Sequence, residues 1–163
     1  MKWVKQSIHY WCPDTKEHKF LGQNVTVAIL DTGISPHPDF KGRILSFRDF
    51  SSTTGSSEKV LFSFSHFSPL IDNSGHGTHV AGILAGSGLL SSGTYAGIAP
   101  FCNLIIGKVL DQNGNGSIKN VINGIQWIRD IYTQFHIRII NISVGTRPDL
   151  SIHQKLLLLN AVE

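Results

Sequence analysis

Short apolar runs alternate with stretches of helical periodicity along most of this chain. Runs rich in β-branched residues predict four buried strands, at 25–30, 42–50, 103–110 and 137–144. Apolar residues three and four positions apart predict helices from Gly77 onward, over 118–135 and over 151–163. Nearly continuous apolar strands that alternate with helices are typical of a parallel sheet covered on both faces. The pattern therefore predicts a three-layer α/β fold in which helices flank a mostly parallel sheet.

Polar residues mark the ends of these elements. Ser117 and Ser151 stand directly before helical patterns and are predicted to cap them. The stretch from Gly86 to Gly93 ends the first helix, and the polar stretch 51–59 is predicted to be a loop. The final helical pattern, "KLLLLNAVE", has no terminal glycine, proline or basic residue, and a further strand would be needed to cover it. We therefore expect a fold truncated before its last strands and helices.

Composition narrows the class of protein. A chain of 163 residues has room for one domain with a real core. Hydrophobic residues make up 41% and charged residues 15%, which excludes a disordered chain. The formal charge is +3, and the 14 lysines and arginines are scattered without a basic helix face. The sequence therefore indicates neither a nucleic-acid nor a membrane partner.

The cellular compartment is suggested by two absences. The first twenty residues contain no apolar core of signal-peptide length, and no apolar run is long enough to span a bilayer. Two cysteines, Cys12 and Cys102, do not form a disulfide framework, so free thiols are expected. We expect a cytoplasmic location, and the sequence does not indicate an oligomeric state.

Ligands of such folds bind beyond the carboxyl ends of the parallel strands. This rule selects Asp31 after the first strand, the "NGNG" loop at 113–116 and the segment 143–145. A carboxylate at the end of a buried strand is costly unless it is paired. Asp31 could cap a turn made by "DTG", or it could orient a catalytic partner.

The candidate partner lies in "DNSGHGTHVAGILAG", residues 72–86. His76 stands at the start of a helix, among small residues that allow another segment to approach the ring. The helix N-terminus should keep the imidazole neutral, and a carboxylate on its other nitrogen would fix the tautomer. His79, one turn later, is expected to face the sheet beside Thr78 and Gly82 and to be structural.

Four segments resemble, in order, landmarks of the subtilisin-like serine proteases: "AILDTGISPHPDF", "GHGTHVAGILAG", "GIAPFCNLIIGKVLDQNGNGS" and "RIINISVG". The resemblance runs from about Gly22 to Gly145, and the motifs are most similar to those of intracellular bacterial members of the family. It implies a serine-type endopeptidase that acts on extended peptide or protein substrates. The family's catalytic aspartate falls on Asp31 and its catalytic histidine on His76. Residues 1–21 would then be an N-terminal extension and 22–163 a partial catalytic domain.

The resemblance also implies where substrate binds. The family's two substrate-binding edge segments fall on Gly114, Asn115 and Gly116, and on Ser143, Val144 and Gly145. Their backbone groups would pair with an extended peptide as an added strand. Val144 would also line the pocket for the side chain before the scissile bond. Alternatively, the glycine-rich loop is a plain turn and Gly145 only ends a strand.

The chain departs from the family in its nucleophile. It contains no Gly-Thr-Ser motif and no G-x-S-x-G motif. The oxyanion-hole asparagine falls beyond residue 163, and Asn141 is not its counterpart. Because the triad cannot form an acyl-enzyme without its serine, this chain alone is expected to be inactive. The mechanism requires no cofactor, although Asp39 matches an acidic residue that binds calcium in some members. One carboxylate makes a poor calcium site, and the companion loop is not clear in residues 86–97.

Three alternatives remain open. A zinc hydrolase would use His76, His79 and an aspartate, but the glutamate of H-E-x-x-H is absent. A non-catalytic fragment could bind peptides or a partner. A decayed gene product would have no function.

Overall fold

A mostly parallel sheet forms the centre of the protein. The computed structural model describes residues 2–10, 20–51, 58–60, 71–145 and 151–162. The sheet has five strands in the order β3-β2-β4-β1-β5. Four run parallel: β1 (Thr26–Asp31), β2 (Ile44–Asp49), β4 (Asn103–Lys108) and β5 (Ile137–Ile142). The fifth, β3 (Glu58–Val60), pairs antiparallel with β2 at the edge.

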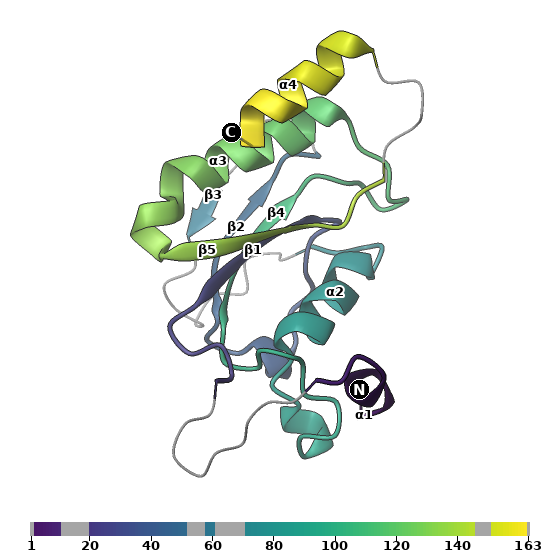
Figure 1. Cartoon of the computed structure of the whole chain (residues 1–163), viewed down its shortest axis with the longest axis vertical. Coiled ribbons are helices and arrows are strands. Elements are labelled where there is room, and N and C mark those ends of the chain that lie inside the picture. Colours follow the sequence, from purple (N-terminus) through teal and green to yellow (C-terminus); the bar gives the residue numbers. More distant parts are fainter. Residues whose placement is uncertain (1, 11–19, 52–57, 61–70, 146–150, 163) are drawn as a thin grey trace.

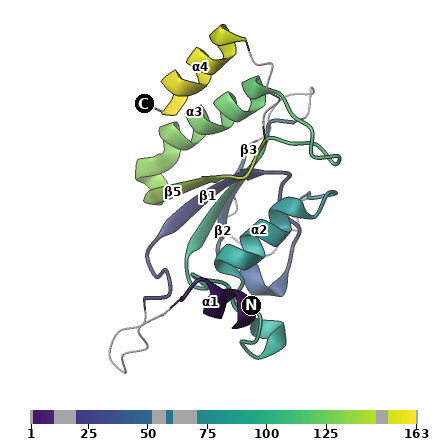
Figure 2. The ribbon, with the colours of Figure 1, turned by 45° about the vertical axis from the view of Figure 1, so that its right-hand side comes forward.

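Helices cover both faces of this sheet. The helices are α1 (Lys2–Ser7), α2 (His76–Ala85), α3 (Ile118–Phe135) and α4 (Ile152–Val162), with short 3-10 turns at Pro38–Phe40 and Leu89–Ser91. Helix α2 lies against one face and α3 against the other, while α4 packs on the outside of α3 (Figures 1 and 2). The expected three-layer α/β architecture is confirmed.

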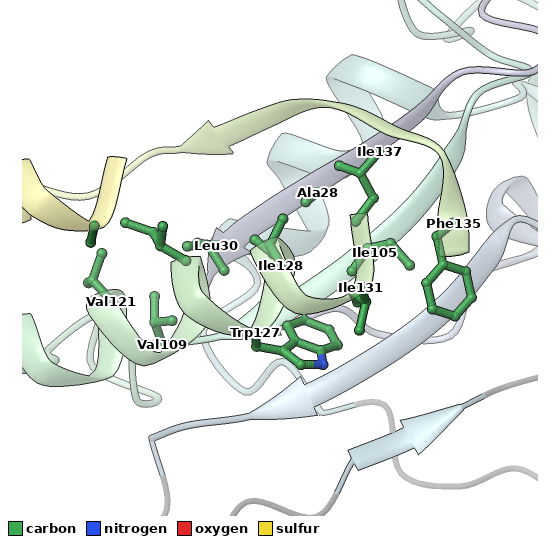
Figure 3. Packing of buried hydrophobic residues seen from close by; sticks show 12 residues of the cluster. Ala28, Leu30, Ile105, Val109, Val121, Trp127, Ile128, Ile131, Phe135 and Ile137 are labelled. Atoms are coloured by element: carbon green, nitrogen blue, oxygen red, sulfur yellow. The ribbon is translucent and has the colours of Figure 1, made fainter. Parts of the chain in front are cut away.

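Alternate residues of β1 serve two separate cores. Val27 and Ile29 belong to the cluster under α2, and Ala28 and Leu30 to the cluster under α3. All four are at most 2% exposed. Figure 3 shows the second cluster, which includes Trp127 of α3. A strand buried on both faces is why the sequence shows a continuous apolar run here.

The four predicted strands and three predicted helices are all present. Ser117 Oγ accepts a hydrogen bond from the Asn120 amide at 3.1 Å, and Ser151 Oγ accepts one from the Gln154 amide at 3.2 Å. Both predicted caps are therefore confirmed. Cys102 is a free, buried thiol as expected, whereas Cys12 lies outside the described residues.

Two elements were not predicted. Glu58–Val60 forms β3 although its first residues were expected to belong to a polar loop, so that loop prediction was wrong at its end. A three-residue edge strand is defined by pairing with its neighbour and carries too little periodicity to be recognised. The second is helix α1, whose Lys5 Nζ donates to the Gly97 carbonyl at 2.9 Å; after it, Tyr10 Oη donates to the Ile98 carbonyl at 2.7 Å.

Candidate active site

Asp31 and His76 meet at the carboxyl edge of the sheet. Asp31 is the last residue of β1 and is fully buried, while His76 is the first residue of α2 and its side chain is 53% exposed. His76 Nδ1 lies 2.7 Å from Asp31 Oδ1. Because a carboxylate can only accept, Nδ1 carries a proton, and in the neutral form of the ring Nε2 keeps its lone pair. The pairing predicted from sequence is present in the structure.

The Asp31 carboxylate has few other partners. Its Oδ1 also accepts the amide proton of Thr32 at 2.7 Å. Its Oδ2 is buried and has no hydrogen-bond partner in the described part of the chain. The negative charge of Asp31 therefore acts mainly on the His76 ring.

Asp31 shifts the titration of His76. The hydrogen bond to Asp31 and then the charge of that carboxylate raise the pKa of His76 above its ordinary value, although desolvation acts in the opposite direction. From the sequence alone, the helix N-terminus is expected to keep this ring neutral. The adjacent carboxylate instead favours the imidazolium, as a group that stabilises developing positive charge should.

Replacing Asp31 by asparagine should lower the pKa of His76, as measured by NMR titration of the ring protons. Because the pKa of His76 is raised, the folded chain binds the imidazolium proton of His76 more tightly than the unfolded chain does. The contribution to stability is therefore complete below the ordinary histidine pKa and is lost as pH rises through the folded value. The variant should lack this pH dependence of the unfolding free energy. An unchanged His76 titration midpoint in Asp31→Asn would contradict the assigned contact.

Two glycines make the approach of α2 to β1 possible. A Cβ added at Gly77 would overlap the carbonyl oxygen of Gly33 and lie 3.2 Å from Asp31 Cβ. Gly33 has φ +117°, and a side chain there would overlap the carbonyl oxygen of Ile71. The small residues beside His76 therefore allow the backbones to come close, as the sequence suggested.

Asp72 is a component of this site that the sequence analysis did not assign. It is only 8% exposed, and its carboxylate accepts hydrogen bonds from the amides of Gly75 (2.9 Å) and Thr78 (2.8 Å). It also accepts from the hydroxyls of Thr32 (2.8 Å) and Thr78 (2.5 Å). Burial, the largest single influence, would raise its pKa, but the hydrogen bonds from Thr78, Thr32 and Gly75 together lower it. The sequence signal that could have identified Asp72 is the preference for aspartate just before the start of a helix.

The loop after β4 is shaped by a second aspartate. Asp111 Oδ1 accepts the amides of Asn113 at 2.8 Å and Asn115 at 2.9 Å, and Gly114 has φ +76°. Residues Gly114, Asn115 and Gly116 are exposed. The loop is therefore a built turn whose tip is accessible, which is compatible with either of its two predicted roles.

The segment 143–145 follows β5 at the same edge of the sheet. Ser143 Oγ accepts a hydrogen bond from Asn141 Nδ2 at 2.8 Å. Ser143 and Gly145 are exposed, whereas Val144 is half-buried and packs against the core cluster under α3. The predicted role of Val144 in a substrate pocket stays a prediction.

Comparisons with known proteins show which family has this fold and these motifs. The model of the subtilase family (Peptidase_S8) matches residues 22–160. The chain belongs to the subtilase family. Serine protease AprX of Bacillus subtilis is 47% identical over 106 residues, which cover 65% of this chain and 21% of that protein. The major intracellular serine protease of the same organism is 37% identical over 131 residues, covering 79% and 36%.

Solved subtilase structures share the fold. Sphericase superposes with a TM-score of 0.67 at 27% identity, covering 86% of this chain and 42% of its own. The Clostridium perfringens CspB protease gives 0.71 at 28% identity, covering 88% and 33%. This subtilase chain thus spans between about a fifth and two fifths of the length of these relatives.

His79 does not face the sheet, as the sequence of this subtilase had predicted that it would. It is exposed and lines a hollow on the outer face of α2 with His37 and Tyr95, so the expectation that it faces the sheet was wrong. The buried residues of α2 are Gly77, Ala81 and Ala85. Each residue turns about 100° around the helix, so His79, two positions after Gly77, lies on the opposite side.

The described residues offer no metal centre. No group of three or more His, Cys, Asp or Glu side chains that could hold a metal ion occurs within the described ranges. Asp39 Oδ2 accepts the Gly88 amide at 3.0 Å and Oδ1 faces the Leu90 amide at 3.4 Å. Amide protons surround this carboxylate where a calcium site needs further oxygens. The donor set does not fit calcium, so binding at Asp39 stays a prediction without structural support.

Proposed function

We propose that Asp31 and His76 are the catalytic aspartate and histidine of a subtilisin-type endopeptidase. The 2.7 Å contact between Asp31 Oδ1 and His76 Nδ1 carries the proposal, because it pairs a fully buried carboxylate with a half-exposed imidazole. An exposed ring whose inner nitrogen is held by a buried acid is the arrangement a general base requires.

In the proposed reaction, His76 Nε2 accepts the proton of a serine hydroxyl as its oxygen attacks the peptide carbonyl. Asp31 holds the ring in one tautomer and stabilises the imidazolium that forms. The imidazolium then protonates the leaving amine, and water repeats the cycle on the acyl-enzyme. These steps need a nucleophile that the 163 residues do not supply in a Gly-Thr-Ser motif.

We propose that the substrate is a peptide or protein segment in extended conformation. The exposed segments 114–116 and 143–145 would pair with it through their backbone groups. Support comes from their position, since both follow parallel strands at the edge that carries Asp31.

The proposed reaction requires no cofactor. None of the helices in the described part of the chain is long and apolar enough to cross a bilayer.

We propose a cytoplasmic location, which is supported by the name of one relative, the major intracellular serine protease.

The isolated chain should not react with a fluorophosphonate probe directed at activated serines. Without a serine placed against His76, no hydroxyl in the chain is expected to be nucleophilic. The measurement is mass spectrometry of the intact chain after incubation with the probe. Stoichiometric labelling of any serine would show that a nucleophile is present and would contradict the proposed inactivity.

The function itself is tested by fusing residues 22–163 to the C-terminal part of a subtilase relative that contains its serine. The fusion should hydrolyse casein if Asp31 and His76 complete the triad. A fusion that folds but neither hydrolyses casein nor reacts with the probe would count against the protease. It would instead favour a non-catalytic binding role, for which the exposed Ile139, Ile140 and Ile142 on the edge strand β5 offer a surface.

A further inference from the structure

A second bridge runs beside the contact between Asp31 and His76. It joins the residues that follow them directly: Thr32 Oγ1 accepts the amide proton of Gly77 at 2.9 Å. Thr32 is 1% exposed and Gly77 is buried. The end of β1 and the first turn of α2 are therefore connected twice, once through side chains and once through a side chain and the backbone.

Asp72 orients the hydroxyl that makes this second bridge. A threonine hydroxyl has one proton to donate, and Thr32 Oγ1 donates it to Asp72 Oδ1 at 2.8 Å. Because the Gly77 amide can only donate and the Asp72 carboxylate can only accept, the two bonds do not compete, and the bond to Asp72 fixes the orientation of the hydroxyl. Its lone pairs consequently stay available to the Gly77 amide.

Both partners of that hydrogen bond are themselves fixed. The Asp72 carboxylate is held by the amides of Gly75 and Thr78 and by the Thr78 hydroxyl, all around the first turn of α2. The carbonyl oxygen of Thr32 accepts a hydrogen bond from the buried Lys108 Nζ at 2.6 Å. Thr32 is thus restrained through both its main chain and its side chain.

We propose that Asp72 is a positioning residue that acts through Thr32 to hold the start of α2 against the end of β1. Half of the His76 side chain is in solvent, so the position of its ring depends on the backbone that carries it. Through Thr32, Asp72 keeps that backbone at the distance at which Nδ1 reaches Asp31. The role deepens the proposed function, since it concerns the geometry of the same pair.

The decisive variant is Thr32→Val, which removes the hydroxyl without changing the charge near His76. We expect the NMR titration midpoint of His76 to fall, because a looser contact with Asp31 favours the imidazolium less. Thr32→Ser, which restores a hydroxyl, should keep the original midpoint. Ser117→Ala removes a comparable hydrogen bond, the cap of α3, and should leave the midpoint unchanged. A folded Thr32→Val chain with an unchanged midpoint would overturn the proposal.

A double-mutant cycle separates positioning by Asp72 from its charge, which also raises the pKa of His76. Asp72→Asn should lower the midpoint in the unmodified chain and lower it by less in the Thr32→Val background. Equal decreases in both backgrounds would show that Asp72 acts by charge alone and would overturn the positioning role.

Hydrogen exchange on the unmodified chain provides a result even where a variant does not fold. The Gly77 amide should exchange at least as slowly as the Thr78 amide, which is bound to Asp72. Much faster exchange at Gly77 would show that the second bridge is open and would overturn the proposal. None of these measurements uses turnover, so their failure is distinguishable from an inactive fusion protein.

Discussion

Replacing His76 by alanine in the completed fusion protein is expected to lower kcat/KM by about 10⁴-fold or more. His76 is the group proposed to remove the serine proton, and Asp31 has no other side-chain partner among the described residues. Loss of the ring therefore removes the general base, and it leaves the buried Asp31 carboxylate without the group that it orients. The measurement is steady-state hydrolysis of a chromogenic peptide, with circular dichroism to confirm that the variant is folded.

His79→Ala is the matched control, because it removes a second imidazole from the same helix. His79 is exposed on the far side of α2 and makes no hydrogen bond to Asp31 or His76 among the described residues. Its removal should change kcat/KM by no more than a few-fold, as expected for a surface substitution. Equal losses in folded His76→Ala and His79→Ala proteins would refute the assignment of His76.

Gly77→Ala should lower the free energy of unfolding of the chain by about 3 kcal/mol, at the upper end of the usual cost of overpacking. The added methyl group would overlap the Gly33 carbonyl oxygen and lie 3.2 Å from Asp31 Cβ. The first obstacle is a backbone atom and the second is a Cβ attached directly to the backbone, so neither can rotate away. Helix α2 would have to move outward and carry His76 away from Asp31. Urea unfolding followed by circular dichroism measures the change.

Gly82→Ala in the same helix is the control for that substitution. Apart from the adjoining backbone of α2 itself, no atom of the described residues lies within 4 Å of a Cβ at Gly82, so the alanine meets no obstacle. Because alanine favours the helix more than glycine does, this variant should be more stable by about 0.5–1 kcal/mol. If Gly77→Ala were as stable as Gly82→Ala, the close approach of α2 to β1 would be wrong.

Much of the fold follows from periodicity along the chain. Strands such as β1 are buried on both faces, which produces continuous apolar runs that are easy to recognise. Helix α3 has a broad apolar stripe and a serine cap, and both signals are local. The pairing of Asp31 with His76 was also accessible, since strand ends in parallel sheets converge and the flanking motifs resemble those of a known family.

The periodicity was misleading in α2. Its larger apolar residues have helical spacing, and Val80 and Leu84 pack against the core cluster, yet Ile83 is 40% exposed while Ala81 and Ala85 are fully buried. Small residues face the sheet because the helix lies so close to β1 that larger side chains do not fit. Apolar patterns give weight to large side chains, so they did not show that His79 lies on the side of α2 away from the sheet.

The sequence by itself determined four strands and three helices in their order along the chain, the pairing of Asp31 with His76, and the small residues that let them meet. Only the tertiary structure decided that Thr32 and Asp72 join the end of β1 to the start of α2. These contacts connect residues 40 to 45 positions apart. A polar residue buried for such a contact carries no periodic signal, because its partner is chosen by how the layers pack and not by its neighbours along the chain.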